Sequence, residues 1–255
     1  KGTELPWSLA PSELEGYSVV GYRADGTPIT LPNMVSFTGW MLTDGGNWGY
    51  YKNGICQYHW QQIDGAWYYF MPVTGFMVQR GVAWINDRLY VFDDSGKCVT
   101  AEGFYEIPTY FYVWTVDGTN IIRPETGVAR FYLNQNGYVQ TGWNYIGGYW
   151  YMCDRDWGFM LTNSWYVDDA GWWYYFDADS HMVTGWYKAE TGKTYYFNEY
   201  GVLQWGWITV DGNRYFMSKK DASRIESQWY RADDPNGNNE EGYWYLFDDN
   251  GVMQT

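Results

Sequence analysis

Three pairs of adjacent aspartates are the side chains best placed, by type and spacing, for acid–base chemistry. They are Asp93-Asp94, Asp168-Asp169 and Asp248-Asp249. Two neighbouring carboxylates can act as a general acid and a general base, as they do in glycoside hydrolysis. These pairs recur where turns are expected, however, and aspartate oxygens commonly accept hydrogen bonds from the backbone of a turn. We therefore assign the pairs to turns and predict no catalytic residue.

Histidine and cysteine offer little further chemistry. His59 and His181 are the only histidines and occupy different places in the pattern described below, so we predict neither a metal site nor a nucleophilic centre, and no cofactor. Cys56 and Cys98 stand where comparable segments, such as Gly251-Val252-Met253, have methionine. Both are interpreted as small apolar substitutes for a packing methionine.

Tryptophan is the residue with a regular spacing. One tryptophan returns about every 21 residues, and Phe104 takes the equivalent place between Trp84 and Trp143; the other members are Trp40, Trp60, Trp165, Trp186, Trp207 and Trp229. Aromatic residues make up 22% of the chain, more than a conventional core requires. A period this short predicts a repeat protein whose units bury large rings against their neighbours.

Each repeat has two short β-prone runs around a glycine-containing turn, which predicts a hairpin. In the run Trp173-Tyr174-Tyr175-Phe176 alternate residues point to opposite faces, so one face is free to pack on the next hairpin. The predicted fold class is all-β, an elongated solenoid of stacked β-hairpin repeats of about 21 residues.

The repeats are expected over residues 38–255, in about ten units. Residues 104–142 are degenerate, and we interpret them as two weak units or as one unit with an insertion. A polar stretch at 233–239 is expected to lengthen the first turn of the last unit. Residues 1–37 hold four of the eight prolines and do not follow the repeat; they are predicted to form a cap or the end of a preceding domain. Because the chain begins at Lys1 without a signal-peptide pattern, we expect a processed or excised segment.

The charge of the chain restricts its partners. Sixteen basic residues stand against 30 acidic ones, a formal net charge of −14, with no basic run. Nucleic acids and anionic membranes are therefore disfavoured, because both need clustered cations. No apolar stretch reaches the length of a membrane span, so no membrane insertion is expected. The charge favours a cationic or neutral partner.

The repeat resembles a known family. Thr184-Gly185-Trp186, Trp67-Tyr68-Tyr69-Phe70 and Gly75-Phe76-Met77 resemble the cell-wall-binding or choline-binding repeats of Gram-positive surface proteins. These segments are also similar to the glucan-binding repeats of glucansucrases and to the repeats of large clostridial toxins. The resemblance covers residues 38–255. It implies a superhelical stack of hairpins, secretion to the bacterial cell surface, and binding to choline-substituted teichoic acid without catalysis.

The resemblance also implies ligand-binding residues. In choline-binding members the quaternary ammonium is walled by the tryptophan that opens one unit, the first aromatic of its second strand, and a tyrosine of the next unit. Carried over, this gives three candidate cages: Trp165, Trp173, Tyr196 and Met182; Trp40, Trp48 and Tyr69; and Trp143, Tyr149 and Tyr175. Three further units are expected to be incomplete. The Trp186 unit has Thr194 and Phe216, the Trp207 unit has Arg214 and Leu246, and Trp60 with Trp67 lacks an aromatic wall at Val91.

Several functions remain open from the sequence. The preferred one is attachment to choline-bearing cell-wall polymer. The alternative is an adhesin or lectin that binds a glucan, a host glycan or a host protein. A third is an enzyme whose catalytic part lies in residues 1–37 or outside the segment, although 37 residues are too few for an ordinary catalytic domain. Pairing of two copies through the terminal hairpins is also left open.

Overall fold

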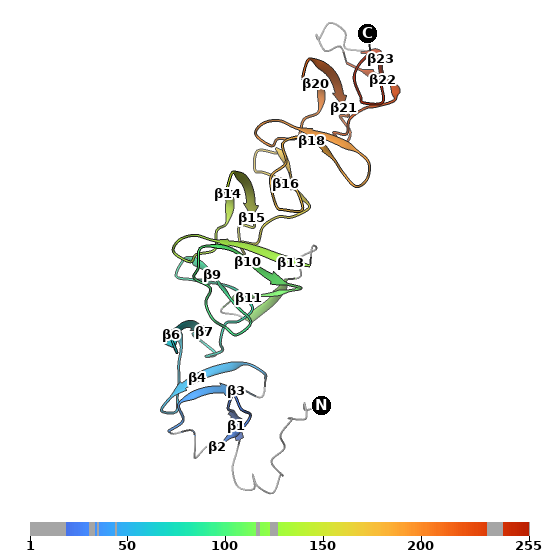
Figure 1. Cartoon of the computed structure of the whole chain (residues 1–255). Helices are drawn as coiled ribbons and strands as arrows, with labels where there is room; N and C mark the ends of the chain where they lie inside the picture. Colours follow the sequence, from blue (N-terminus) through green and yellow to red (C-terminus); the bar gives the residue numbers. More distant parts are fainter. Residues whose placement is uncertain are drawn as a thin grey trace. The chain divides into compact units, whose positions relative to one another are not determined.

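In the computed structural model, residues 19–30, 34, 36–43, 45–115, 118–122, 127–233 and 242–254 are described. They form strands joined by turns, which confirms the predicted all-β class (Figure 1). No helix among them is long and apolar enough to cross a membrane. The polar stretch expected at 233–239 lies outside the described residues except for Asp233, as do residues 1–18 of the predicted cap.

The chain divides into two compact units, one of residues 1–141 with 154–159 and one of residues 142–153 with 160–255. The strands of the first are β1 (Val19–Tyr22), β2 (Pro28–Thr30), β3 (Gly39–Leu42), β4 (Trp48–Lys52), β5 (Ile55–Cys56), β6 (His59–Ile63), β7 (Ala66–Phe70), β8 (Gly81–Ile85), β9 (Arg88–Phe92), β10 (Gly103–Pro108), β11 (Phe111–Thr115), β12 (Gly118–Ile122) and β13 (Val128–Leu133). Those of the second are β14 (Gly142–Ile146), β15 (Tyr149–Cys153), β16 (Ser164–Val167), β17 (Trp173–Phe176), β18 (Gly185–Lys188), β19 (Thr194–Phe197), β20 (Gly206–Val210), β21 (Asn213–Met217), β22 (Gln228–Ala232) and β23 (Tyr243–Phe247).

The second unit is a run of antiparallel hairpins, each made of two consecutive strands. Each opens with the periodic tryptophan on its first strand, which faces an aromatic or apolar residue of the second strand, as Trp165 faces Tyr175. A side-chain oxygen orders many of the turns. The Oδ1 atom of Asp168, for example, accepts the backbone N–H groups of Ala170 and Trp172 at 3.0 and 2.9 Å.

The same turn geometry accounts for the other two aspartate pairs. Asp93 Oδ1 accepts the N–H groups of Ser95 and Lys97, and Asp248 Oδ1 accepts those of Asn250 and Val252. The prediction that these pairs form turns is confirmed for the first aspartate of each pair. Their oxygens hold the backbone in place.

Within each unit, a backbone hydrogen bond links successive hairpins. After the second strand, the chain turns back and a single residue bridges the end of that strand, as Met182 does to Phe176 and Leu203 to Phe197. The N–H of this residue then donates to a carbonyl of the preceding hairpin, from Met182 to Trp150 and from Leu203 to Trp173, both at 2.8 Å. We call this position the linking position. Cys98 occupies it in the first unit, with its N–H 2.8 Å from the carbonyl oxygen of Trp67, so its predicted place as a methionine substitute is confirmed.

The first unit departs from simple hairpins at residues 104–142. Strand β10 pairs with β13 along their whole length, so this region is one hairpin, and β11 and β12 are inserted between its strands. Strand β11 also pairs in parallel with β8. Gly81 permits this close approach, because an added Cβ would lie within van der Waals overlap of the Tyr112 backbone. Of the two interpretations of residues 104–142, the structure has the single unit with an insertion.

At the other end of the first unit, β1 and β2 join the sheet of the first repeat hairpin, β3 with β4. Tyr22 of β1 pairs with Leu42 of β3, and Ile29, Phe37 and Met41 form a small buried cluster. The boundary expected between residues 37 and 38 stays a prediction.

Candidate binding site: aromatic cages between hairpins

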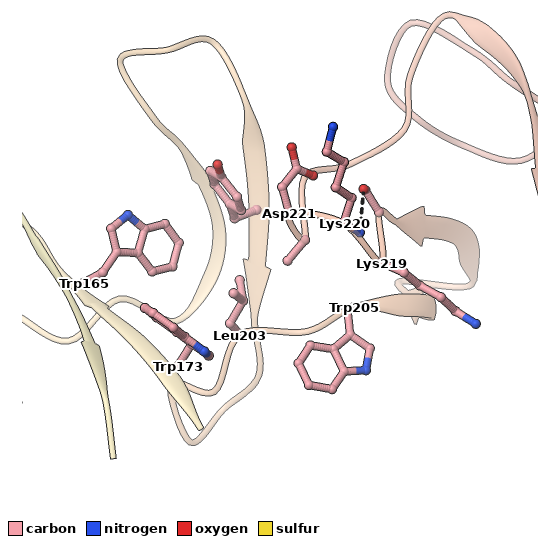
Figure 2. A pocket seen from close by; sticks show the side chains of 10 residues that line it. Trp165, Trp173, Leu203, Trp205, Lys219, Lys220 and Asp221 are labelled. Carbon is pink, nitrogen blue, oxygen red and sulfur yellow. Dashed lines mark hydrogen bonds between the residues drawn. The ribbon is translucent and has the colours of Figure 1, made fainter. Parts of the chain in front are cut away.

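The Trp165 ring is the centre of an open cage of aromatic side chains. Its ring centre lies 6.5 Å from that of Trp173 at an angle of 71°, and 5.2 Å from that of Tyr195 at 75°. Trp165 and Trp173 come from β16 and β17 of one hairpin and Tyr195 from β19 of the next; Leu203, at the linking position, completes the lining (Figure 2). Trp165 and Trp173 remain 39% and 43% exposed, so their inner faces are open to a ligand.

A second cage of the same construction surrounds Trp143. Trp150 lies 6.2 Å away at 85°, and Tyr174 of the next hairpin lies 4.9 Å away at 69°. Met182 is at the linking position, and Glu199 is also part of the lining of a cavity of 300 Å³. Trp150 is 44% exposed. With Tyr200, this cavity is lined by four rings, a thioether and an acidic residue.

The third cage, around Trp60, differs from the sequence expectation. Trp67 and Tyr90 lie 6.2 and 4.9 Å from the Trp60 ring, and Cys98 also lines the cavity of 360 Å³. The expectation that this unit lacks an aromatic wall at Val91 is wrong, because Val91 points into the buried core and Tyr90 takes the wall position. The signal was available, since alternate strand residues point to opposite faces.

The Trp40 hairpin carries the same set of side chains. Tyr68 of the next hairpin lies 4.9 Å from the Trp40 ring, and Trp48, Tyr68 and Met77 pack in one cluster with it. Met77 is at the linking position, with its N–H 2.7 Å from the Trp48 carbonyl oxygen.

In all three cages predicted from the resemblance, the tyrosine from the next hairpin is the residue one position earlier in the sequence. The wall from the next hairpin is Tyr195 rather than Tyr196, Tyr68 rather than Tyr69, and Tyr174 rather than Tyr175. The displaced tyrosines face the other way, toward the tryptophan of their own hairpin: Tyr196 lies 4.9 Å from Trp186, Tyr69 lies 5.2 Å from Trp60 and Tyr175 lies 5.1 Å from Trp165.

Two further residues of the predicted cages, Tyr149 and Met182, also lie elsewhere than predicted. Tyr149 stacks on His181 with ring centres 3.7 Å apart, and Trp150 rather than Tyr149 stands beside Trp143. Met182 lines the Trp143 cage and not the Trp165 cage, because the linking residue contacts the hairpin before its own. Trp165 lies beside Trp173, and Trp40 and Trp48 pack against one buried cluster, while the role of these tryptophans and of Trp143 in binding stays a prediction.

The Trp186 hairpin holds a cation of the protein itself. Arg224 occupies the linking position, with its N–H 2.7 Å from the Thr194 carbonyl oxygen, and its guanidinium lies 5.1 Å from the Trp186 ring centre. Tyr215, 4.8 Å from Trp186, forms the wall in place of the predicted Phe216, which packs 5.1 Å from Trp207 instead. Glu226 pairs with the guanidinium at 2.6 Å.

At Trp207 the wall is likewise shifted by one residue. Tyr245 lies 4.8 Å from the Trp207 ring, where Leu246 was expected. Arg214, the other residue expected to leave this unit incomplete, accepts through its backbone carbonyl the N–H of Met253 at 2.8 Å, and its side chain is exposed.

Burial raises the pKa of two titratable side chains in these cages, Tyr174 and Cys98. Burial, together with a hydrogen bond that its hydroxyl donates to Asp168 Oδ2 at 3.1 Å, raises the pKa of Tyr174 to about 12. Burial, with a smaller contribution from the Asp93 charge, raises the pKa of the Cys98 thiol to about 12. Neutral rings and a neutral thiol are walls suited to apolar contact and to the ring quadrupole.

Metal-ligating side chains come together once within the described residues, where Asp177, Asp179 and His181 offer atoms within 4.8 Å of one another. The Oδ1 atom of Asp177 already accepts the N–H groups of Asp179 and His181, both at 2.9 Å. This group is the ordinary turn of the repeat.

Comparison with known proteins follows the same repeats. Residues 167–205 match a family model described as a choline-binding repeat, and residues 60–70 and 238–253 match a putative cell wall binding repeat. The first match runs from the end of β16 to Trp205 and thus includes Trp173, Tyr195 and Leu203 of the Trp165 cage.

Solved structures of pneumococcal proteins share the fold. Choline binding protein F of Streptococcus pneumoniae is 26% identical with a TM-score of 0.53, over 82% of this chain and 76% of that one. The same protein in the presence of a peptidoglycan analogue, a tetrasaccharide-pentapeptide, is 24% identical with a TM-score of 0.55, over 85% and 79% of the two chains.

A curated relative is much longer. Glucosyltransferase-I of Streptococcus downei is 28% identical over 148 residues, which are 54% of this chain and 9% of that protein. The matching models, the shared hairpin fold and the aromatic clusters between hairpins agree: the repeats of this chain are similar to choline-binding and cell wall binding repeats.

Proposed function

We propose that this chain is a non-catalytic binding module that attaches to choline-substituted teichoic acid at the surface of a Gram-positive bacterium. The observation that carries the proposal is the repetition of one cage: at Trp60, Trp143 and Trp165 two tryptophans of one hairpin and a tyrosine of the next are among the residues that line a cavity. The Trp40 hairpin has the same side chains.

The chemistry of these walls suits a quaternary ammonium. A trimethylammonium group donates no hydrogen bond, so its recognition depends on ring quadrupoles and apolar contact, worth roughly 0.5–2 kcal/mol per ring. Three rings correspond to binding in about the millimolar range, near −4 kcal/mol. The net charge of −14 adds a long-range attraction for cations.

A cation already lies against one of these rings. Arg224 places its guanidinium over Trp186 at the linking position, where Met182 and Leu203 stand in the neighbouring cages. The frame of the repeat thus accommodates a delocalised positive charge next to the opening tryptophan. This internal contact supports an exogenous cation as the ligand of the cages that lack an arginine.

Several weak cages on one chain act together on a polymer. When one choline group is bound, the next is held at a high effective concentration, and the overall affinity exceeds that of a single cage. Such binding fits attachment to a wall polymer with repeated choline groups, and hence the expected secretion and cell-surface location.

The competing function is that of a lectin or adhesin that recognises a glucan, a host glycan or a host protein. The similarity to a glucosyltransferase over 148 residues keeps a glucan ligand in consideration. Aromatic walls also suit sugars where polar groups lie beside the rings, as Thr100, Asn136 and Tyr138 do in the Trp60 cavity.

Choline-resin retention and choline titration of the tryptophan fluorescence test the proposal. We expect retention that free choline reverses, and a fluorescence change that Trp165→Ala, Trp143→Ala and Trp60→Ala each reduce. Trp172→Ala is the matched control, because Trp172 is 50% exposed and lines none of these three cavities. No retention and no fluorescence change at millimolar choline would overturn the proposal, and binding on a glycan array would then favour the lectin.

A further inference from the structure

Each of the three cavities is lined by a turn that comes from beyond the next hairpin. These turns follow β13, β19 and β21, each the second strand of the hairpin two places after that of the opening tryptophan. They contribute Asn136 and Tyr138 to the Trp60 cavity, Glu199 and Tyr200 to the Trp143 cavity, and residues 218–222 to the Trp165 cavity. We call each of them the closing turn of its cage. A cavity is thus lined by three successive hairpins, and the third supplies the closing turn.

Glycine lets a closing turn lie against the linking residue of its cage. In the closing turn of the Trp143 cage, a Cβ added to Gly201 would overlap the Met182 side chain. Gly96 stands in the same relation to Met77. This contact is made by the backbone at the glycine. The side chains beside the glycine can therefore differ from cage to cage while the turn keeps its place.

The closing turn of the Trp143 cage brings a negative charge to the cavity. Glu199 lines the cavity beside Tyr200, and both residues are exposed. Among the described residues, Glu199 forms no ion pair with a lysine or an arginine. The closing turn of the Trp60 cage, by contrast, contributes no charged residue to its cavity. Two cages of the same construction thus differ in one charge.

The closing turn of the Trp165 cage carries a different set of charges. Asp221 lines the cavity, but its carboxylate accepts a hydrogen bond from Lys193 Nζ at 2.8 Å, so its charge is paired. Lys219 and Lys220 also line the cavity, and Figure 2 shows their ammonium groups directed away from the two cage tryptophans. The lysines leave the cage open, and within the described residues no unpaired carboxylate lines it.

A carboxylate beside an aromatic cage distinguishes ligands by charge and not by shape. A trimethylammonium group and a tert-butyl group have nearly the same size and outline, so the rings make the same apolar contacts with both. Only the ammonium gains in addition from the ring quadrupoles and from a nearby negative charge.

We infer that Glu199 is a specificity-determining residue, which makes the Trp143 cage select a cationic ligand over a neutral one of the same shape more strongly than the Trp165 cage does. The inference rests on the proposed function and adds that the cages of one chain differ in their selection by charge. The closing turn, which belongs to neither of the two hairpins that supply the cage rings, sets this selection.

Titrations that follow the indole N–H resonances of Trp143 and Trp165 in the full, 15N-labelled chain test this assignment. The ligands are choline and 3,3-dimethyl-1-butanol, its neutral analogue with carbon in place of nitrogen. Glu199→Gln is expected to weaken choline binding at Trp143 about 2- to 5-fold at low salt and to leave the binding of the neutral analogue unchanged. High salt should remove most of the difference between variant and wild type, because an exposed charge is screened. At Trp165, choline affinity should be the same in both proteins.

Glu190→Gln is the matched control. Glu190 lies between β18 and β19, on the hairpin that also supplies the closing turn of the Trp143 cage, and it is exposed and lines none of the three cavities. This variant removes the same charge from the chain, so it separates an effect of Glu199 from an effect of the net charge of −14. We expect no change in choline affinity at Trp143.

The outcomes separate the inference from the function on which it rests. If wild type binds choline at Trp143 and Glu199→Gln binds it equally well, or if Glu190→Gln loses as much affinity, the role of Glu199 is overturned while the cage stands. If Glu199→Gln loses affinity for the neutral analogue as much as for choline, Glu199 shapes the cavity, and its selection by charge is overturned. If choline shifts neither indole resonance in wild type, the proposed function and the inference both fall.

Discussion

The guanidinium of Arg224 lies 5.1 Å from the ring centre of Trp186, on the hairpin that follows the Trp165 cage. Trp186 is 37% exposed, and Thr194 replaces the second tryptophan of a complete cage. The arginine is held by its backbone hydrogen bond and by Glu226. In this hairpin, a cation of the protein itself, the Arg224 guanidinium, thus lies over the ring of the opening tryptophan.

Replacing that arginine is expected to make Trp186 sensitive to choline. In Arg224→Met the ring loses its internal cation, and the linking position gains a methionine as in the Trp143 cage. The indole N–H resonance of Trp186 should then shift on choline addition, whereas in wild type we expect no shift. Binding there should be weaker than at Trp165, by about one ring or roughly 0.5–2 kcal/mol, because Thr194 provides no wall. Arg214→Met, which changes an exposed arginine elsewhere, is the control. A choline-insensitive Trp186 in Arg224→Met would contradict the account.

Two neighbouring tyrosines test which one forms a wall. Tyr195→Ala removes the ring 5.2 Å from Trp165 and is expected to weaken choline binding at that cage by about 3- to 30-fold. Tyr196→Ala removes a ring that packs on Trp186 and should leave the Trp165 cage unchanged. Titration of the Trp165 indole resonance measures both, and equal losses in the two variants would contradict the observed register.

Tyr174 predicts a dependence on alkaline pH. Its pKa is raised from 10.0 to about 12, mainly by burial and also by the hydrogen bond to Asp168, so the folded state favours the neutral phenol. The stabilisation it contributes is complete below pH 10 and is lost as the pH rises from 10 toward 12. NMR titration of 13C-labelled tyrosine should show a late transition for Tyr174. Asp168→Asn should lower that pKa, and Asp169→Asn, the adjacent carboxylate, should not.

Gly201 tests the contact between a turn and the Trp143 cage. Its φ is +77°, and an added Cβ would overlap the Met182 side chain, which lines that cage. Gly201→Ala is expected to lower the free energy of unfolding by about 1–2 kcal/mol and to weaken choline binding at Trp143. Gly192→Ala carries the same backbone strain at φ +82° but meets nothing within 4 Å, so it should destabilise without changing choline affinity. Equal effects on binding in both variants would count against a role of Met182.

The repeat and the hairpins could be predicted from the sequence because both depend on local signals, the spacing of tryptophan and the glycine-containing turns. The choice of wall residue could have been predicted as well. Because Tyr174 and Phe176 lie on the opposite face from Trp173 and Tyr175, it is Tyr174 and not Tyr175 that faces the preceding hairpin. Trp143 of that hairpin lies 4.9 Å from Tyr174 and 5.6 Å from Phe176. The resemblance to the family gave the adjacent tyrosine instead, which this alternation places on the other face.

Other features lie beyond local patterns. The parallel pairing of β11 with β8 joins residues about 30 apart through an insertion that has no repeat of its own. The contact of Arg224 with Trp186 could not be predicted either. The turn from Met217 to Arg224 is one residue longer than the turn from Phe176 to Met182, so the spacing of that repeat does not place Arg224 at the linking position. Neither the hydrophobic pattern nor the period indicates where that arginine's side chain lies.

The bond from the linking residue to the preceding hairpin uses only backbone atoms. Methionine, leucine, cysteine and arginine all occupy this position, at residues 182, 203, 98 and 224, and all donate the same hydrogen bond. The side chain there is consequently free to vary without loss of the frame. Such a chain can carry both open cages and sites occupied by one of its own side chains, as Arg224 occupies the site at Trp186. A mutation at the linking position can change the ligand affinity of one site while the backbone of the neighbouring hairpins stays the same.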